Sequence, residues 1–446
     1  MKENNELKPL SDLRSSRLFQ EFLFSGSEVK GRGWDDFVSK VKAEFHVEND
    51  AELEELADRE VRLYLAQDLF DIADYDAAIE AYNELIKIYP GYVQAYNELA
   101  ACYYENDQPE QAIEYYNKAL EIDPEFSLVY SNRAIVKESL EDYDGALEDY
   151  NRAIEIDPED DNAYFCRGRM RAELGESDAA MDDFNKAIEL WPDIHEYYIG
   201  RGKLRAESED IEGAYDDFSR AIELEEFEAE PYALRGDLLA EKGDYEAARN
   251  DYNAALGIDE EHAEAYLGLG LLSFNEDDLT EAFDFFNKAV SANPEFAEAY
   301  NNRGIVHYEN EQYAAAIADF DKVLELDPGY EEAYYYMGLI KMDTGDDEGA
   351  LGDFEKALEL DPDYADVYKT RSFMRLEKYD IEGALEDLDE ALEIDPEDDE
   401  ALSMRSELRA ATGDYEGAAE DLKAALELDP DNEDYKAMLK EVLSKM

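Results

Sequence analysis

Arginine and aspartate recur along the chain at a fixed separation of 16 residues. Seven pairs share this spacing: Arg133/Asp149, Arg167/Asp183, Arg201/Asp217, Arg235/Asp251, Arg303/Asp319, Arg371/Asp387 and Arg405/Asp421. Three positions lack both charges, namely Leu65/Ala81, Leu99/Tyr115 and Leu269/Phe285, and only Met337/Asp353 breaks the correlation. Charges that disappear together indicate an ion pair, because one buried charge without its partner is costly. Ligand binding by these arginines is the alternative, and the coupled replacement favours the structural pair.

The other side chains that could do chemistry are scattered. The four histidines, His46, His195, His262 and His307, lack the spacing of a metal site, and Cys102 and Cys166 form no CxxC motif. The acidic loops at 157–162 and 395–400 lack the spacing and the central glycine of a calcium-binding EF-hand. No GxxxxGK[ST], GxSxG or HExxH motif occurs. The sequence therefore predicts no catalytic residue, no metal and no cofactor, and a protein that is not an enzyme.

The prolines reveal the elements that position these side chains. Nine of the twelve prolines are separated from one another by 34 residues or by a multiple of 34: Pro90, Pro124, Pro158, Pro192, Pro294, Pro328, Pro362, Pro396 and Pro430. Glu226 and Glu260 occupy the two missing steps, where we expect a softer joint between two halves. Eleven units of 34 residues thus run without insertion over 59–432.

Each unit has the pattern of two antiparallel helices. Its fourth residue is Tyr in nine units, its eighth is always Ala, Gly or Ser, and its twentieth is Ala in all eleven. Its twenty-fourth residue is an aromatic ring or Leu. Small and apolar residues at three- and four-residue steps indicate helices. The small side chains let two helices approach closely, and the rings fill the space beside them.

This pattern resembles the tetratricopeptide repeat (TPR) family over residues 59–432. The resemblance implies an all-α fold, a right-handed α-solenoid of helix-turn-helix hairpins whose first helices line a concave groove. It also implies a non-catalytic protein–protein interaction scaffold. We expect an N-terminal helical segment at 1–48, the solenoid with a helical lead-in at 49–432, and a C-terminal capping helix at 433–446.

The N-terminal segment differs from the rest in composition. Residues 1–43 carry eight basic and seven acidic residues, a net charge of +1, which leaves −77 for the remainder. Trp34, Val38, Val41 and Phe45 share one face of a predicted helix, which Phe37 widens. A second apolar cluster lies at 18–24. The segment is either a cap packed on the first hairpin or an arm for docking or dimerisation.

The resemblance places the groove at the second, fifth, sixth, ninth, twelfth and thirteenth residues of each unit. These positions are mostly small or charged in units four to six, and apolar or aromatic in units seven to ten. An apolar stripe with amide donors could hold an extended peptide, although neighbouring helices could instead cover several of these side chains. The candidate peptide-binding residues are Asn132, Arg169, Lys203, Leu271, Phe274, Asn302, Ile305, Tyr308, Tyr335, Tyr336, Leu339, Met342, Lys369 and Phe373.

Charge narrows the choice of partner. The 446 residues include 41 Lys and Arg against 117 Asp and Glu, a net charge of −76. This balance argues against a nucleic acid, because phosphate binding needs clustered cations. With no apolar run of membrane-spanning length, we expect a cytoplasmic protein with no membrane partner. The acidic surface would steer a basic partner, or it reflects adaptation to high salt.

The groove positions also bear on binding of chaperone tails. Some TPR proteins grip chaperone C-terminal tails with Lys, Asn and Arg at fixed groove positions in three consecutive units. Only Arg169, Lys203 and Lys369 are basic at groove positions here, and no consecutive trio fits, so such tails are disfavoured. The alternative to a peptide-binding scaffold is a structural or assembly component that self-associates through the solenoid ends or the N-terminal segment.

Overall fold

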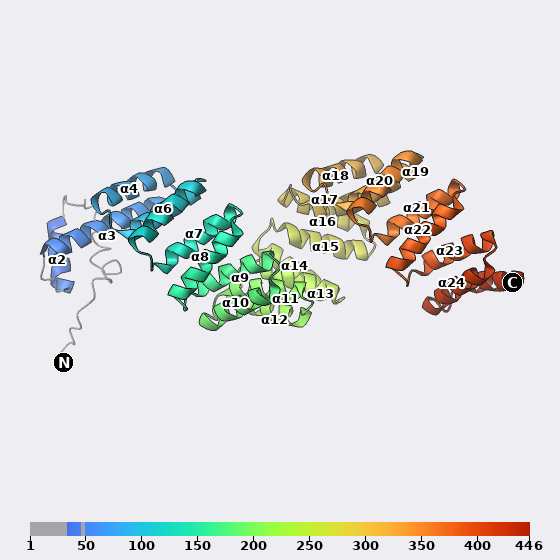
Figure 1. Cartoon of the computed structure of the whole chain (residues 1–446), viewed down its shortest axis with the longest axis horizontal. Helices are drawn as coiled ribbons and strands as arrows, with labels where there is room; N and C mark the ends of the chain where they lie inside the picture. Colours follow the sequence, from blue (N-terminus) through green and yellow to red (C-terminus); the bar gives the residue numbers. More distant parts are fainter. Residues whose placement is uncertain (1–33, 46–49) are drawn as a thin grey trace. The chain divides into compact units, whose positions relative to one another are not determined.

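The computed structural model describes residues 34–45 and 50–446, and every regular element in these residues is an α-helix (Figure 1). The helices pack in pairs, as the all-α solenoid of hairpins predicts. The chain divides into two compact units, the first ending at Leu224 and the second beginning at Glu225. Each unit is a stack of hairpins in which each hairpin packs on the next.

The first unit contains eleven of the described helices. Their bounds are α2 Trp34–Phe45, α3 Asp50–Asp71, α4 Tyr75–Ile88, α5 Val93–Glu105, α6 Pro109–Ile122, α7 Ser127–Ser139, α8 Tyr143–Ile156, α9 Asp161–Glu173, α10 Ser177–Leu190, α11 His195–Glu207 and α12 Ile211–Leu224. From α3 onward, each odd-numbered helix and the helix that follows it form one hairpin.

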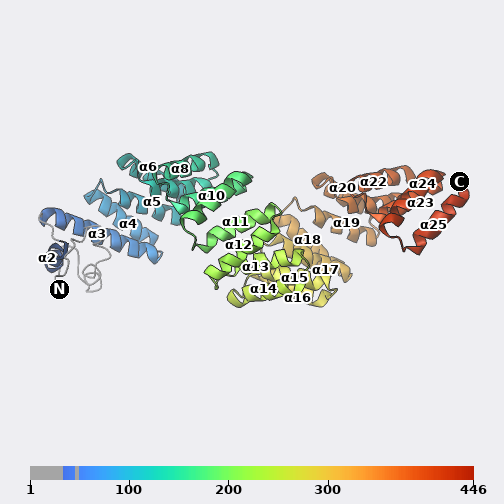
Figure 2. The same cartoon turned by 90° about the horizontal axis from the view of Figure 1, so that it is seen from below.

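The second unit continues the same pattern (Figure 2). Its helices are α13 Glu230–Glu241, α14 Tyr245–Ile258, α15 Ala263–Asn275, α16 Leu279–Ala292, α17 Ala297–Glu309, α18 Tyr313–Leu326, α19 Glu331–Asp343, α20 Asp347–Leu360, α21 Ala365–Glu377, α22 Ile381–Ile394, α23 Asp399–Thr412, α24 Tyr415–Leu428 and α25 Glu433–Lys445. The last helix packs on α24 and buries Val442.

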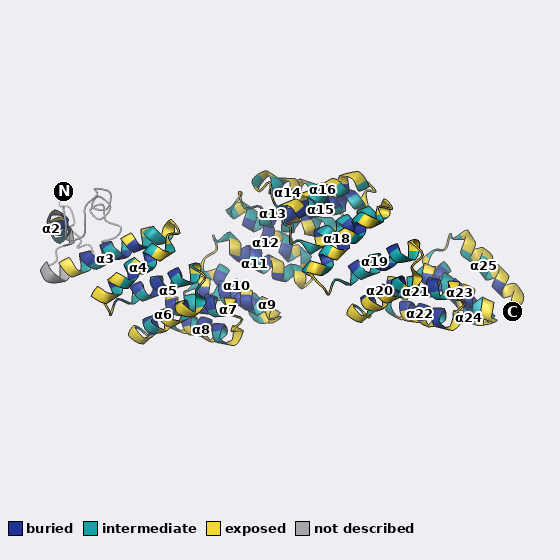
Figure 3. Cartoon of the chain, turned by 90° about the horizontal axis from the view of Figure 1, so that it is seen from above, coloured by how far each residue is buried: buried dark blue, intermediate teal, exposed yellow. Residues whose placement is uncertain are grey.

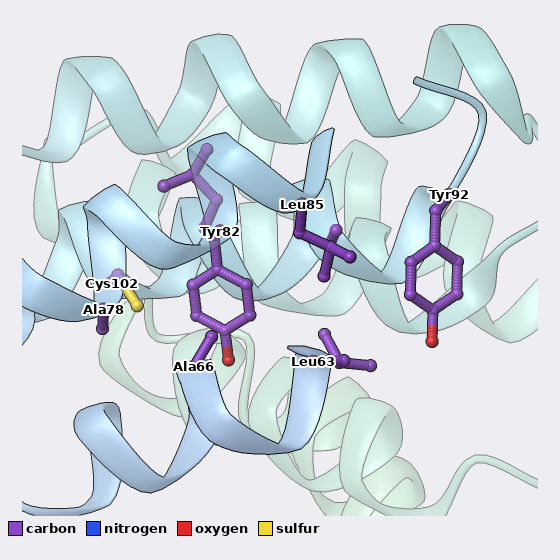
Figure 4. Packing of buried hydrophobic residues seen from close by; sticks show 9 residues of the cluster. Leu63, Ala66, Ala78, Tyr82, Leu85, Tyr92 and Cys102 are labelled. Carbon is purple, nitrogen blue, oxygen red and sulfur yellow. The ribbon is translucent and has the colours of Figure 1, made fainter. Parts of the chain in front are cut away.

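The core is repeated in every hairpin. Buried and exposed residues alternate along each helix with the helical period (Figure 3). Tyr82 of α4 is buried with Ala66, Ala78 and Cys102 (Figure 4). Where the small residue is glycine, the ring fills the place of a side chain: a Cβ added at Gly338 would lie 2.5 Å from Cε1 of Phe354. The invariant small residues therefore make room for the neighbouring ring.

The turn inside each hairpin uses one left-handed residue. The fifteenth residue of every unit has a positive φ. Four of these residues are glycines, Gly175, Gly243, Gly345 and Gly413, and the others are Ala73, Asp107, Glu141, Glu209, Asp277, Glu311 and Tyr379. Aspartates then cap many of the second helices; Asp346, for example, accepts a hydrogen bond from the Gly349 backbone amide at 3.1 Å.

The N-terminal helix α2 packs on α3. Trp34, Phe37 and Val41 are buried, whereas Val38 is only half-buried. The predicted apolar face is therefore buried at Trp34, Phe37 and Val41 and partly open at Val38. Packing of α2 on α3 favours a cap on the first hairpin over a free arm. The apolar cluster at 18–24 lies outside the described residues.

Candidate functional site

All seven predicted Arg–Asp pairs form within their hairpins. In the pair between α17 and α18, Arg303 Nη2 lies 2.5 Å from Asp319 Oδ1, and Arg303 Nε lies 2.8 Å from Oδ2. Asp319 is 6% exposed, so this is a largely desolvated, two-point contact. The same guanidinium donates from Nη1 to Asn287 Oδ1 of the preceding hairpin at 2.8 Å. The pair therefore joins two helices of one hairpin and also links neighbouring hairpins.

A second basic residue, one helical turn after the arginine, also contacts the aspartate. The 16-residue spacing of the predicted pairs does not reveal it. These residues are Lys137, Arg171, Arg205, Lys341, Arg375 and Arg409, each 12 residues before its aspartate. Lys341 explains the exception at Met337, because its Nζ lies 2.6 Å from Asp353 Oδ2. A search for basic residues at this 12-residue spacing would have found them. The seven arginines of the predicted pairs thus contact aspartates of their own hairpins, as the coupled replacement in the sequence predicts.

Three of the five candidate aromatic residues of the second unit lie together on α17 and α19. The rings of Tyr308 and Tyr336 meet edge to face with centroids 5.5 Å apart, and Tyr335 contacts Tyr336 at 5.4 Å. Tyr336 also stacks on the core residue Phe320 at 5.6 Å. The cluster is anchored in the core, so the positions of its rings are fixed.

The remaining apolar candidates differ widely in exposure. Ile305 is buried at 7% exposed, whereas Phe373 of α21 is 48% exposed. Leu271 and Phe274 of α15 are half-buried, as are Leu339 and Met342 of α19. Neighbouring helices thus cover part of the predicted stripe, and Phe373 together with Leu376 presents its most accessible end.

The polar candidates contact the chain itself. Asn302 Nδ2 donates to the Glu298 carbonyl of its own helix at 2.9 Å, and Asn132 Nδ2 donates to Asn97 Oδ1 at 3.0 Å. Arg169 lies 2.7 Å from Glu138. Lys203 lies exposed on α11.

Lys369 of α21 is held by three carboxylates. Its Nζ lies 2.9 Å from Asp398, 3.2 Å from Glu400 and 3.3 Å from Asp366. Lys369 is one of the candidate peptide-binding residues, and in the structure its ammonium contacts carboxylates of the chain itself.

Three carboxylates outside the candidate set lie on the first helices of the second unit: Asp237, Glu298 and Glu332. Burial raises the pKa of Asp237 to about 6, with further contributions from Glu298 and Glu264. Burial also raises the pKa of Glu298, with Glu332 adding to it, and the pKa of Glu332. Yet Asp237 and Glu298 reach solvent, and Glu332 is half-buried. Accessible side chains that are desolvated by surrounding protein are expected on a concave surface.

Beside these carboxylates, Asn301 of α17 is 1% exposed. Its Nδ2 donates to Glu332 Oε2 across the α17–α19 contact at 2.7 Å. Its side-chain oxygen is buried and accepts no hydrogen bond from any described residue. The pattern of the repeats alone does not predict this unpaired oxygen, because its pairing depends on which residue of the next repeat lies opposite Asn301.

Across residues 34–45 and 50–446, no three His, Cys, Asp or Glu side chains converge as they would around a metal ion. Cys102 and Cys166 are buried thiols, as expected of packing residues. No helix in the described part of the chain is both long and apolar enough to cross a membrane.

Family models for the tetratricopeptide repeat match along most of the chain. Their descriptions are "Tetratricopeptide repeat" and "TPR repeat", and the matches fall at 59–102, 93–126, 139–170, 162–194, 199–260, 233–295, 297–330, 331–364 and 375–443. The chain belongs to the tetratricopeptide repeat family. It therefore has the fold of a protein-interaction scaffold. No curated protein matches the chain.

Solved structures share the fold at low sequence identity. The chain resembles the APC/C hetero-tetramer Cut9-Hcn1, with a TM-score of 0.52, 14% identity and coverage of 97% of this chain and 98% of the other. It also resembles the human IFIT1 dimer with m7Gppp-AAAA, with a TM-score of 0.53, 15% identity and coverage of 79% and 90%. At this identity the likeness shows the fold alone.

Proposed function

We propose that this chain is a non-catalytic scaffold that holds a peptide or helix of a partner protein in the groove lined by α15, α17, α19 and α21. The observation that carries the proposal is the side-chain content of these first helices. The rings of Tyr308, Tyr335 and Tyr336 form one cluster, and Phe373 leaves about half of its surface open. A rigid aromatic surface that ends in an exposed ring suits an apolar side chain of an extended or helical peptide.

Charge favours a basic partner over a nucleic acid. The net charge of −76 repels phosphate, whereas a peptide with lysine or arginine gains both steering and contacts. Raised pKa values at Asp237, Glu298 and Glu332 indicate that negative charge is costly on this surface in the absence of a partner. A cationic ligand would relieve that cost.

Selection from a phage-displayed library of random decapeptides tests the proposal. The wild-type chain is expected to retain a peptide family with apolar residues, and the variant Phe373→Ala/Leu376→Ala to lose it at least tenfold. Both residues are exposed, so the fold should survive the change. Phe227→Ala is the matched control, because Phe227 is 73% exposed on the segment between α12 and α13. Failure of the wild-type chain to select any peptide would contradict the proposal.

Self-assembly is the competing class of function. The N-terminal helix argues against a free dimerisation arm, because Trp34, Phe37 and Val41 are already buried. Light scattering of the full chain gives the direct measurement. A monomer at micromolar concentration is the expected result, and a concentration-independent dimer would favour the assembly reading.

A further inference from the structure

The most unusual polar group of the second unit is the side-chain amide of Asn301. The hydrogen bond from Nδ2 to Glu332 fixes which end of the amide is the acceptor. The buried oxygen is then left without a donor among the described residues. Buried acceptors in native proteins nearly always have a partner, and exceptions tend to mark functional sites.

The same chain shows how this position is satisfied elsewhere. Asn97 occupies the equivalent place in the second repeat, and its oxygen accepts a hydrogen bond from Asn132 of the next repeat at 3.0 Å. The residue equivalent to Asn132 beside Asn301 is Tyr336, which has no amide. The missing donor therefore follows from one replacement in the neighbouring repeat.

A second comparison within the chain shows which group fits. Two repeats further on, the equivalent position carries Lys369, whose ammonium contacts Glu400 at 3.2 Å. Glu400 is the counterpart of Glu332 in its repeat. Where Lys369 supplies a cation to its carboxylates, the site at Asn301 has the carboxylate and lacks the cation. No lysine, arginine or histidine in the described part of the chain forms an ion pair with Asp237, Glu298 or Glu332.

A metal ion is a poor candidate for this place. Calcium and magnesium need six or more oxygen ligands at short distance, and no such convergence occurs among the described residues. An ammonium or guanidinium group instead donates hydrogen bonds to separate acceptors. The Asn301 oxygen, Glu332 and Glu298 are acceptors of this kind. Tyr330 lies nearby, since burial and the charges of Glu298 and Glu332 raise the pKa of its hydroxyl.

We infer that Asn301, Glu298 and Glu332 form a pocket for one basic side chain, lysine or arginine, of a bound peptide. The inference rests on the proposed function, since the peptide lies in the same groove. It adds a fixed point on the peptide: the basic residue sits between α17 and α19, next to the Tyr308–Tyr336 pair. The overall negative charge attracts basic partners in general, whereas this pocket requires a lysine or arginine at one particular position of the bound peptide.

The test uses the same decapeptide selection with variants of the full chain. Glu298→Gln/Glu332→Gln removes both charges, and Asn301→Lys fills the pocket from within, as Lys369 does two repeats later. Glu393→Gln/Glu427→Gln removes the same charge from exposed positions on α22 and α24 and is the control. Circular dichroism checks folding, and we expect the melting temperature of Asn301→Lys to equal or exceed that of the wild type.

The wild type and the control should enrich lysine or arginine at one fixed position of the peptide. Both pocket variants should lose that enrichment at least fivefold while they keep the apolar positions. The peptide that binds best is then synthesised with norleucine in place of the basic residue, which removes the charge and keeps the aliphatic chain. Calorimetry should show at least tenfold weaker binding to the wild type and little difference for Asn301→Lys. The enriched residue itself distinguishes lysine from arginine.

Two outcomes overturn the inference separately from the proposed function. Enrichment of basic residues that is equal in the wild type and both pocket variants would mean that the overall charge selects them, and the pocket would fall while the groove stands. Selection of apolar peptides without any preference for a basic residue would also overturn the pocket and leave the groove in place. If the wild type selects no peptide, the groove itself fails and the pocket with it.

Discussion

Arg303 and Asp319 meet through two hydrogen bonds of 2.5 and 2.8 Å between the two helices of one hairpin. His307, one turn after Arg303, places its Nε2 3.9 Å from the same carboxylate. Asp319 is nearly inaccessible to solvent, so its charge depends on these neighbours. Such an ion pair adds little to the stability of the fold compared with a well-packed apolar pair. Removing one partner is nevertheless destabilising, because the other charge then stays buried and unpaired.

Removing Arg303 alone is therefore expected to cost more than removing both partners. Arg303→Leu should destabilise its hairpin by about 3 kcal/mol, because Asp319 stays buried. Arg303→Leu/Asp319→Phe copies Leu269 and Phe285, the apolar pair of the preceding repeat, and should recover most of that loss. Because repeat arrays unfold in parts, hydrogen exchange of α17 and α18 is the suitable measurement. Equal loss of protection in both variants would contradict the pairing.

This pair illustrates what the sequence can predict. Eleven copies of one unit act as an internal alignment, so coupled replacement at two positions reveals contact without any structure. The helical period and the small residues predict the hairpins for the same reason. The contact between Lys341 and Asp353 is not predicted by the 16-residue spacing, because these two residues are 12 positions apart. The 12-residue spacing of such basic and acidic residues is equally regular.

The site was less predictable than the fold. Whether Ile305 is buried and Phe373 exposed depends on how neighbouring hairpins overlap, which residue type alone does not determine. The unpaired oxygen of Asn301 depends on Tyr336 standing where another repeat has an asparagine. Such features come from single departures from the repeat, whereas sequence patterns report what the repeats share.

The contact between Gly338 and Phe354 predicts a second stability effect. Gly338→Ala would place a Cβ 2.5 Å from the ring, so one of the two helices must shift. We expect destabilisation of about 1–3 kcal/mol from this overpacking. Gly352→Ala, on an exposed position of α20 with open space around it, should instead stabilise by about 0.5–1 kcal/mol through helix propensity. Thermal melting of both variants checks the opposite signs. Two shifts of the same sign would be inconsistent with a steric cause.

Tyr379 offers a test of backbone strain. It has φ 63° in the turn before α22 and is 91% exposed, so its ring contributes little packing. Tyr379→Gly should stabilise the turn by about 1 kcal/mol, because glycine adopts positive φ without steric cost. Tyr379→Ala keeps the strained backbone and should have a smaller effect. If alanine stabilises as much as glycine, the benefit comes from removing the ring and the strain argument fails.

The division of the chain predicts where proteolysis begins. Glu226 and Glu260 both replace the repeated proline, but only the first lies at the boundary between the two units. At that boundary Phe227 is 73% exposed, and Ala229 at the start of α13 makes no side-chain cap. His262, by contrast, caps α15 by accepting from the Ala265 amide at 3.3 Å.

Brief chymotrypsin digestion should therefore cut first after Phe227. The products should be two stable fragments, each about half of the 51.0 kDa chain. Phe227→Ser should delay the appearance of both fragments. First cleavage near residue 260 would contradict the expectation, because it would place the weaker joint inside the second unit.

Asp237 should make stability depend on pH. Its pKa is raised from the ordinary 3.8 to about 6, mainly by burial, against the hydrogen bond from Tyr252 and with smaller contributions from Glu298 and Glu264. At a pH between these two values, Asp237 therefore holds a proton in the folded chain and has lost it in the unfolded chain. Below the unfolded pKa the side chain of Asp237 is protonated in both states and does not affect stability. As the pH rises, the buried charge destabilises the fold increasingly, and this effect is complete once the pH exceeds the folded pKa.

Asp237→Asn should thus raise the melting temperature at pH 8, keep about half of that advantage at pH 5 and lose most of it near pH 4, close to the unfolded pKa. Asparagine keeps an oxygen that can accept the 2.7 Å hydrogen bond from the Tyr252 hydroxyl, so the change isolates the charge. Glu393→Gln, at an exposed position on α22, is the control and should change little at either pH. Melting curves at several pH values measure the difference. A pH-independent difference between Asp237→Asn and the wild type would show that packing, and not the protonation of Asp237, governs this position.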